Sequence, residues 1–318
     1  MIERRDILLS AGAGLLAAAS SAASEPLPNW IVNSGHAQDP TPARKDGIAL
    51  ALGGGAAKGF AHIPFLECLD ELGVRPTQIA GTSMGAILGA VYCSGMSGRD
   101  IRTYTLDLFA KRRPLMQKLL LDTGDNWASL FNLVKPAVID PEVLLGSLLP
   151  DSLKRDFSDL QIPLKVVATD YHGQSQYVIS EGPLLSAIAA SSALPVLLTP
   201  VRRDGVLLID GGFVNPTPFD VLDTPDDIAT IGIDVTGSDS HDDGNTPGAM
   251  KVWISSFNIT LHSIVEAKLT GSHPDLLVRP PIGQFSTMEF FKVEAILAAA
   301  DQARDTFKRE IDAVLDRP

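Results

Sequence analysis

Two kinds of apolar pattern alternate along the chain from residue 47 onward. Short continuous apolar runs, such as Gly47–Leu52, are typical of strands buried on both faces of a parallel sheet. Longer segments with apolar residues every three or four positions predict helices that pack on such a sheet. No internal repeat interrupts the pattern, so we expect a single domain of the α/β class over residues 47–318. The expected strands are 47–52, 78–80, 162–169, 176–180, 206–209, 228–235 and 276–278, and the expected helices are 63–73, 84–92, 183–191, 253–269 and 291–315.

The first residues have the layout of an export signal. Two arginines, Arg4 and Arg5, precede an apolar run and then small residues, which predicts a signal peptide over residues 1–23, with cleavage as late as residue 37 as an alternative. The paired arginines favour the twin-arginine type; a general secretory signal and an uncleaved anchor stay open. Residues 24–46 contain four prolines and predict a linker. We therefore expect an exported, periplasmic protein, with membrane association as a minor alternative.

A glycine-rich loop follows the first expected strand. The run Gly53–Gly59, with the sequence GGGAAKG, joins that strand to a helix, an arrangement that leaves backbone N–H groups free to hold an anion. A phosphate loop needs Gly-Lys followed by Ser or Thr, and a dinucleotide fingerprint needs a third glycine where Lys58 stands. The remaining interpretation is an oxyanion hole, in which the amides from Gly53 to Ala56, those of Gly54 and Gly55 included, stabilise a tetrahedral intermediate.

The second expected strand ends in a candidate nucleophile. The run Gly81–Gly85, with the sequence GTSMG, has the Gly-x-Ser-x-Gly spacing of a nucleophile elbow. In such a turn Gly81 and Gly85 relieve crowding around a serine held at a helix N-terminus. The spacing makes Ser83 the candidate nucleophile, although a glycine-rich turn that contains a serine is common.

A third motif lies near residue 210. The apolar run 206–209 ends in Asp210, and Gly211 and Gly212 follow it. Turn chemistry alone explains Asp-Gly-Gly. A carboxylate at the end of a strand is also placed to face the elbow and to act as a general base toward a serine hydroxyl.

Together, these three motifs resemble those of the patatin-like lipid acyl hydrolases. The glycine loop, the Gly81–Gly85 elbow and Asp210–Gly212 occur in the order found in that family, and Lys58 fits its basic position. The resemblance implies a three-layer α/β/α sandwich with a mostly parallel sheet. It also implies that Ser83 and Asp210 cleave acyl esters of lipids without a histidine, as in phospholipase A or lysophospholipase chemistry. No cofactor and no metal ion are expected.

Two alternatives to this interpretation remain. An α/β-hydrolase triad has the chain order Ser, acid, His, and His241, His262 and His273 all follow Asp210. Ser83 comes after only about two strands, which is early for the elbow of that fold. The other alternative is a lipid-binding protein that has lost turnover. A catalytic pair without histidine predicts no loss of activity near pH ~6.5, where an essential imidazole would be protonated.

Composition narrows the class of partner. A net charge of −12 over 318 residues argues against nucleic-acid binding. The partners that the resemblance implies are a lipid or acyl-ester substrate and, transiently, a membrane surface. A cluster of basic residues between Arg99 and Lys118 predicts a solvated face, or alternatively contact with anionic head groups. The apolar segment 115–134 predicts core packing or a lid. Cys68 and Cys93 fall in apolar helical patterns and are expected to be buried thiols.

Overall fold

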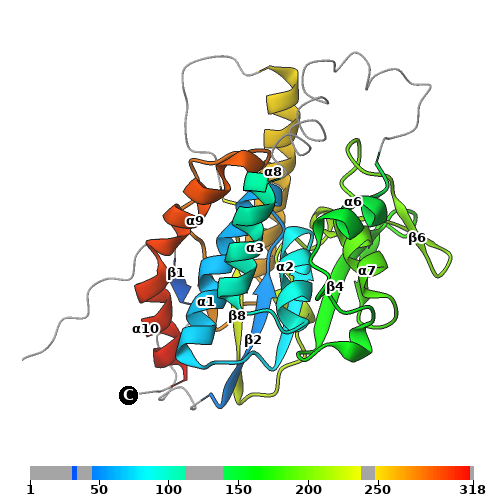
Figure 1. The fold of residues 1–318 in the computed structure, drawn as a ribbon. Coiled ribbons are helices and arrows are strands. Elements are labelled where there is room, and N and C mark those ends of the chain that lie inside the picture. Colours follow the sequence, from blue (N-terminus) through cyan, green and yellow to red (C-terminus); the bar gives the residue numbers. More distant parts are fainter. Residues whose placement is uncertain (1–30, 34–44, 112–138, 238–247, 316–318) are drawn as a thin grey trace, which may run out of the picture.

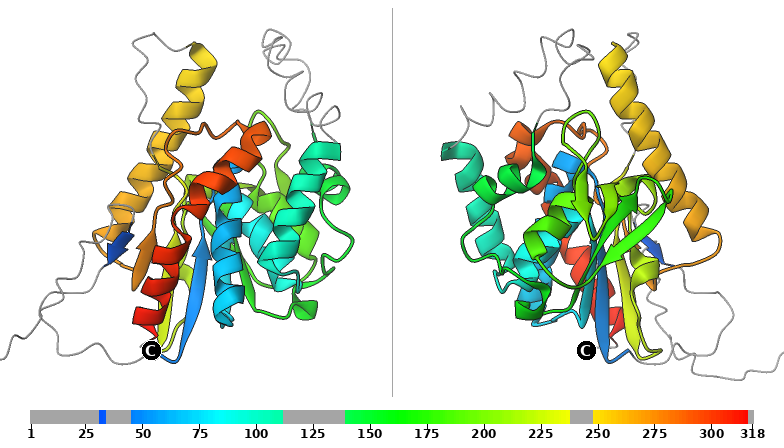
Figure 2. Two further views of the ribbon diagram at one scale, coloured as in Figure 1. Left: turned by 60° about the vertical axis from the view of Figure 1, so that its left-hand side comes forward. Right: turned by 90° about the vertical axis from the view of Figure 1, so that its right-hand side faces the viewer.

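The chain folds around one mixed sheet with helices on both faces (Figures 1 and 2). The structure is a computed structural model that describes residues 31–33, 45–111, 139–237 and 248–315. Within these residues the sheet has nine strands, in the order β1-β9-β8-β2-β3-β4-β7-β6, with β5 paired to β4. The five central strands from β9 to β4 run parallel, which confirms the predicted fold class. The strands are β1 Ile31–Asn33, β2 Gly47–Leu52, β3 Gln78–Thr82, β4 Leu164–Asp170, β5 Ser175–Ile179, β6 Val201–Arg203, β7 Val206–Asp210, β8 Ile228–Ile233 and β9 Leu276–Val278.

The helices divide between the two faces of the sheet. Figure 2 shows α8 on one face, while α1, α2 and α3 lie on the other. The helices are α1 His62–Leu72, α2 Met84–Cys93, α3 Gly98–Lys111, α6 Pro141–Leu148, α7 Leu184–Ser191, α8 Ala249–Leu269, α9 Val293–Asp301 and α10 Arg304–Val314, and two short 3-10 turns, η1 Ala56–Ala61 and η5 Phe290–Lys292, lie near the site. The helical pattern over 291–315 therefore gives two helices, separated at Gln302 and Ala303.

The alternation of side chains along β2 explains how the two layers differ. Ile48 and Leu50 point into the large core beneath α1 and α2. Ala49 and Ala51 point to the opposite face, where they join a smaller cluster with Phe219. Because the strand is buried on both faces, its sequence is a continuous apolar run, as expected for a central parallel strand.

The strands β3 and β7 meet end to end. Val167 of β4 pairs with β3 on one edge and with β5 on the other. The next residue, Ala168, pairs with β5 and with Asp210 of β7. At this point β7 therefore takes over from β3 along the same edge of β4. Since β7 runs antiparallel to β4 and β3 runs parallel to it, the carboxyl ends of β3 and β7 point at one another. This junction brings residue 83 next to residue 210.

Some sequence-based expectations fall outside the described residues or change. The signal peptide and the segment 115–134 lie outside them. The predicted linker 24–46 contains β1, whose backbone pairs antiparallel with β9, so part of it belongs to the sheet. Cys68 and Cys93 are buried free thiols, as predicted. Within the described chain, no helix combines the length and the apolarity needed to cross a bilayer.

One member of the basic cluster is not on a solvated face. The guanidinium of Arg102 in α3 donates to both carboxylate oxygens of Glu67 in α1, at 2.7 and 2.8 Å, and to Asp301 in α9. Arg102 therefore links three helices. The sequence around Arg102 does not indicate these acidic partners, because Glu67 and Asp301 are distant from it along the chain.

Candidate active site

Ser83 stands on a sharp turn between β3 and α2. Its backbone has φ 52° and ψ −120°, a conformation that is unusual for a residue with a side chain. A Cβ at Gly81 would lie 2.6 Å from Cα of Ala86, and one at Gly85 would lie 2.1 Å from the carbonyl oxygen of Leu52. Both glycines are therefore required by close backbone approach, and the turn has the geometry of a nucleophile elbow.

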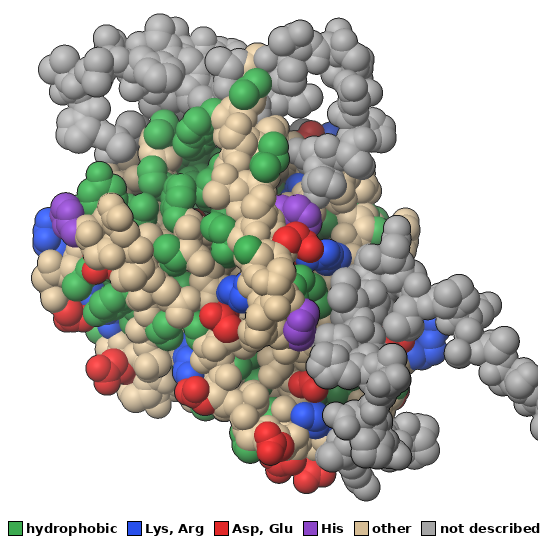
Figure 3. Space-filling view, turned by 180° about the vertical axis from the view of Figure 1, so that it is seen from behind, with side chains coloured by type: hydrophobic (Ala, Val, Ile, Leu, Met, Phe, Trp, Pro, Cys, Tyr) green, Lys and Arg blue, Asp and Glu red, His purple; other side chains and the backbone are tan. Residues whose placement is uncertain are grey.

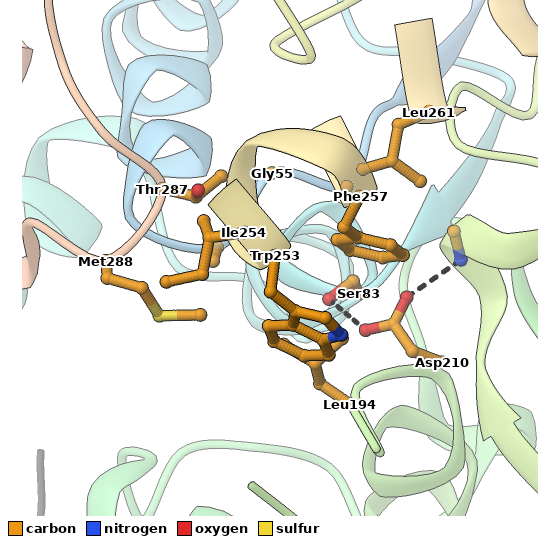
Figure 4. A pocket seen from close by; sticks show the side chains of 13 residues that line it. Gly55, Ser83, Leu194, Asp210, Trp253, Ile254, Phe257, Leu261, Thr287 and Met288 are labelled. Atoms are coloured by element: carbon orange, nitrogen blue, oxygen red, sulfur yellow. Dashed lines mark hydrogen bonds between the residues drawn. The ribbon is translucent and has the colours of Figure 1, made fainter. Parts of the chain in front are cut away.

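The hydroxyl of Ser83 points directly at a carboxylate. Its Oγ donates a hydrogen bond of 2.8 Å to Oδ2 of Asp210, and the N–H of Gly212 donates to Oδ1 at 2.7 Å (Figure 4). The bond from the Gly212 N–H fixes the orientation of the Asp210 carboxylate. Gly211 has no side chain and can therefore lie against Val167, because a Cβ on Gly211 would lie 2.1 Å from the carbonyl oxygen of Val167.

The environment of Asp210 makes it a stronger base than an ordinary aspartate. Burial raises the pKa of Asp210 from 3.8 to about 6, and the hydrogen bonds from Gly212 and Ser83 partly oppose this rise. A carboxylate is a better proton acceptor when its pKa is closer to that of the group it deprotonates, provided that it stays ionised. Above about pH 6 Asp210 meets both conditions.

Two amides of the glycine loop are available to an oxyanion, and two are not. The N–H of Gly53 donates to Ile233 at 3.0 Å and that of Gly54 donates to Pro216 at 2.8 Å. Within the described chain the N–H groups of Gly55 and Ala56 have no such acceptor, and both residues line the cavity at Ser83. The expectation that the Gly53 and Gly54 amides serve the oxyanion is therefore wrong, because these amides continue the backbone bonding of β2.

Gly54 and Ala56 have further roles in the loop. A Cβ on Gly54 would lie 3.2 Å from Cβ of Ser83, so a glycine here lets the loop approach the nucleophile closely. Ala56 has φ 45°, a left-handed conformation that is uncommon for alanine and that turns the chain into η1. The loop is thus shaped by its approach to Ser83.

The last residues of the glycine loop act in packing. Lys58 is fully buried in η1, and its Nζ donates to the carbonyl of Gly237 at 2.8 Å, so it does not line the cavities at Ser83. A Cβ on Gly59 would lie 2.3 Å from Cγ of Met84. Gly59 therefore allows η1 to pack against the start of α2.

Ser191, which belongs to none of the three sequence motifs, holds the elbow. Its Oγ accepts a hydrogen bond of 2.8 Å from the N–H of Ser83 and donates one of 2.6 Å to the carbonyl of Val167. The residue is fully buried at the end of α7. A buried serine hydroxyl needs a polar partner, and a serine at the end of the mostly apolar run 184–191 is the signal that points to such a role.

No described histidine lines the cavities at Ser83. His62 is buried, its Nε2 lies 2.8 Å from the carbonyl oxygen of Gly53, and burial lowers its pKa to about 4, so it is neutral at neutral pH. His172 and His273 are exposed, and His262 lies beside Glu266 on α8. His241 is outside the described residues. Among the described side chains, the carboxylate of Asp210 accepts the hydrogen bond of the Ser83 hydroxyl, as an imidazole does in a catalytic triad.

The surroundings of Ser83 are apolar. A cavity of about 210 Å³, here called the near cavity, opens at Ser83 between α2 and α6, and its polar side chains are those of Ser83, Ser192 and Asp210. A smaller space of about 30 Å³ at Ser83 is lined by Trp253, Ile254, Phe257 and Leu261 of α8 (Figure 4). A lining of this kind suits hydrocarbon next to a reacting ester.

Comparisons with solved structures found VipD from Legionella pneumophila at a TM-score of 0.46 and 16% identity, covering 85% of this chain and 67% of VipD. The type III effector ExoU matches at a TM-score of 0.41 and 16% identity, covering 83% of this chain and 53% of ExoU.

Sequence relatives are closer. An uncharacterised NTE family protein of Mycobacterium tuberculosis is 34% identical over 200 residues, which cover 61% of this chain and 50% of that protein. Patatin-like phospholipase domain-containing protein 6 of Homo sapiens is 30% identical over 280 residues, covering 78% of this chain and 19% of that protein. The chain thus spans half or less of the length of these relatives. The profile of the family described as Patatin-like phospholipase matches residues 50–223, a span that begins in β2 and includes both Ser83 and Asp210. This chain belongs to the patatin-like phospholipase family.

Proposed function

We propose that the protein is a lipid acyl hydrolase that cleaves ester bonds with Ser83 as nucleophile and Asp210 as general base. The observation that carries the proposal is the 2.8 Å hydrogen bond from the Ser83 hydroxyl to the buried Asp210 carboxylate, at the mouth of an apolar cavity. Membership of the patatin-like phospholipase family supports lipid hydrolysis. The proposed substrates are glycerophospholipids and lysophospholipids, cleaved as by a phospholipase A or a lysophospholipase.

The proposed reaction has two halves. Ser83 Oγ attacks the ester carbonyl carbon while Asp210 takes the hydroxyl proton, and the Gly55 and Ala56 amides donate hydrogen bonds to the oxyanion. The intermediate collapses, the carbon–oxygen bond to the alcohol breaks, and Asp210 returns the proton to the departing oxygen. Water then attacks the acyl-enzyme with Asp210 again as base, releasing the fatty acid and restoring the Ser83 hydroxyl. These steps use side chains and backbone amides, so activity should persist in excess chelator.

Assaying the protein on a panel of lipids tests the proposed hydrolase activity directly. We expect the purified mature chain to release fatty acid from at least one phospholipid, lysophospholipid or glyceride, and a fluorophosphonate probe to label Ser83. Ser83→Ala and Asp210→Asn should each abolish turnover, and the double variant should be no worse than either, because the two groups act as a unit. Well-folded protein that neither labels nor releases fatty acid would instead be a lipid-binding protein.

We also propose that the protein meets its substrate at a membrane surface. Three exposed apolar side chains adjoin the cavities: Val143 on α6, Val196 in the turn before β6, and Trp253 on α8. Val143 and Val196 directly precede Leu144 and Leu197, which line the near cavity. Figure 3 shows hydrophobic side chains gathered beside α8. An apolar rim of this kind, here called the rim and defined as Val143, Val196 and Trp253, favours contact with lipid.

The proposed place of action is the periplasm. The pair Arg4-Arg5 before an apolar run supports export by the twin-arginine route. Replacing both arginines by lysine should leave the protein in the cytoplasmic fraction. Export that continues unchanged would favour a general secretory signal.

A further inference from the structure

A second apolar cavity lies beyond the one that opens at Ser83. This far cavity, of about 120 Å³, is enclosed mainly by α2, α3 and α6. It is lined by neither Ser83 nor Asp210, so the proposed chemistry does not use it. The cavity is partly open to the surface, and apolar surface left uncovered in this way favours hydrocarbon over water.

The near and far cavities share a wall. Both are lined by the side chains of Met84, Ile87, Leu145, Leu148 and Phe290. Along α2 the lining passes from Met84 and Ile87, which face both cavities, to Leu88 and Val91, which face only the far one. These residues lie on one side of α2, at the i, i+3, i+4, i+7 spacing of a helix face. At ~1.5 Å per residue, the distance along the helix axis from Ser83 to Val91 is about 12 Å.

The far cavity offers nothing for a charged or strongly polar ligand. Among the described residues that line it none is charged, and the polar groups are Tyr104 and Thr105. The hydroxyl of Tyr104 already donates to the carbonyl of Leu148 at 2.8 Å. Because burying an unpaired polar group is costly, an occupant of this cavity is hydrocarbon.

We propose that the far cavity binds the methyl end of a long acyl chain whose carbonyl carbon lies at Ser83. Ile87 and Leu148, which separate the two cavities, then set the chain length at which the far cavity is reached. Short acyl chains fill the near cavity alone. This proposal rests on the acyl hydrolase function and adds to it a preference for long chains that is set by residues remote from the reacting atoms.

The test separates the two cavities with tryptophan substitutions. Leu108→Trp fills the far cavity from α3. Leu106→Trp is the matched control, because Leu106 is half-buried in the same helix and lines neither cavity. Ile87→Trp narrows the passage between them. For each variant, kcat/KM is measured on p-nitrophenyl butyrate, octanoate, dodecanoate and hexadecanoate in one mixed-micelle system, together with Tm.

We expect Leu108→Trp to lower kcat/KM about tenfold for hexadecanoate while butyrate stays within about twofold, since displaced methylenes lose their burial. Ile87→Trp should extend the loss to dodecanoate, and Leu106→Trp should leave the profile unchanged. An equal loss at every chain length in Leu108→Trp, or no loss at any, would overturn the proposal.

A binding measurement separates this proposal from the proposed function. In Ser83→Ala protein, which has no nucleophile, hexadecanoic acid binding is followed by calorimetry with and without Leu108→Trp. Weaker binding in the double variant supports the far cavity even if no ester is hydrolysed. Equal binding refutes the far cavity even if the wild-type protein is active.

Discussion

At the scale of single residues, the environment of Asp210 sets the pH at which the proposed chemistry runs. Burial raises its pKa to about 6, and only the ionised carboxylate accepts the Ser83 proton. We expect kcat/KM on a soluble ester to rise with pH through about 6 and then to level off. The raised pKa therefore predicts a loss of activity in acid without any histidine, at a pH slightly below that of an essential imidazole. Activity that stays constant down to pH ~4, the ordinary range for a carboxyl group, would contradict the raised pKa.

The same pKa predicts a cost in stability. The folded-state pKa of Asp210 lies above its unfolded value of 3.8, so the folded protein is more stable when Asp210 is protonated. This part of the free energy of unfolding is present below pH 3.8 and is lost as pH rises through about 6. Asp210→Asn lacks this titration. We therefore expect the stability of Asp210→Asn relative to wild type to increase by about 2 kcal/mol between pH ~4 and pH ~8.

Urea unfolding at the two pH values measures this difference. Ser83→Ala serves as a control, since it keeps the titrating carboxylate and loses the same activity. A relative stability that does not change with pH would show that burial does not penalise the charge of Asp210.

The hydroxyl of Ser191 is a further residue-scale determinant. Removing it leaves the Ser83 N–H without its acceptor and frees the elbow to relax. We expect Ser191→Ala to lower kcat about tenfold or more, with a smaller effect on KM. Ser186→Ala is the matched control, because Ser186 is half-buried in the same helix and lines neither the cavity at Ser83 nor the space under α8. Equal effects of the two substitutions would deny Ser191 a positioning role.

At the scale of elements, close packing of α2 on β2 fixes the position of Ser83. A Cβ at Gly85 would lie 2.1 Å from the Leu52 carbonyl, and backbone on both sides leaves little room to yield. We expect Gly85→Ala to destabilise the protein by about 3 kcal/mol or to prevent folding. Gly89→Ala, on the same helix, meets its nearest neighbour at 3.4 Å and should be neutral or stabilising by up to about 1 kcal/mol, because alanine is the better helix former. Thermal unfolding of both variants tests the contrast.

The central elements could be predicted from the sequence, and the reason is their burial. A strand such as β2, which is covered on both faces, must be a continuous apolar run. This pattern can be recognised in the sequence without knowing which strands and helices pack against β2. The direction of β7 could not be predicted, because a parallel and an antiparallel strand can have the same apolar run. The same holds for β1, whose three residues pair with a strand more than two hundred positions away.

The candidate site was predictable in its residue types and not in its contacts. Motif spacing indicates Ser83, Asp210 and the glycine loop. Which amides of that loop are free depends on Ile233 and Pro216, whose carbonyls take the Gly53 and Gly54 N–H groups. The raised pKa of Asp210 depends in the same way on burial by residues distant in sequence. Such tertiary facts have no local pattern.

At the scale of the whole molecule, the exposed rim predicts how the protein meets lipid. Val196 is 47% exposed and has φ 76°, a left-handed conformation that is rare for a β-branched residue. Strain of this kind is retained where a side chain is needed at that position. A valine that is both strained and exposed beside the near cavity is explained if it enters the surface of a bilayer.

The substitution Val196→Asn separates this explanation from packing. Asparagine accepts a left-handed backbone far better than valine, so the variant should be at least as stable as wild type. It should nevertheless bind phospholipid vesicles more weakly and hydrolyse vesicle lipid more slowly, since apolar surface at the rim is lost. Val196 lines neither cavity, so turnover of a soluble short-chain ester should be unchanged. Val178→Asn is the control, because Val178 is 39% exposed on β5 and lies outside the rim. Vesicle sedimentation measures binding directly, and a Val196→Asn protein that binds vesicles as wild type does would remove the rim from the proposed membrane contact.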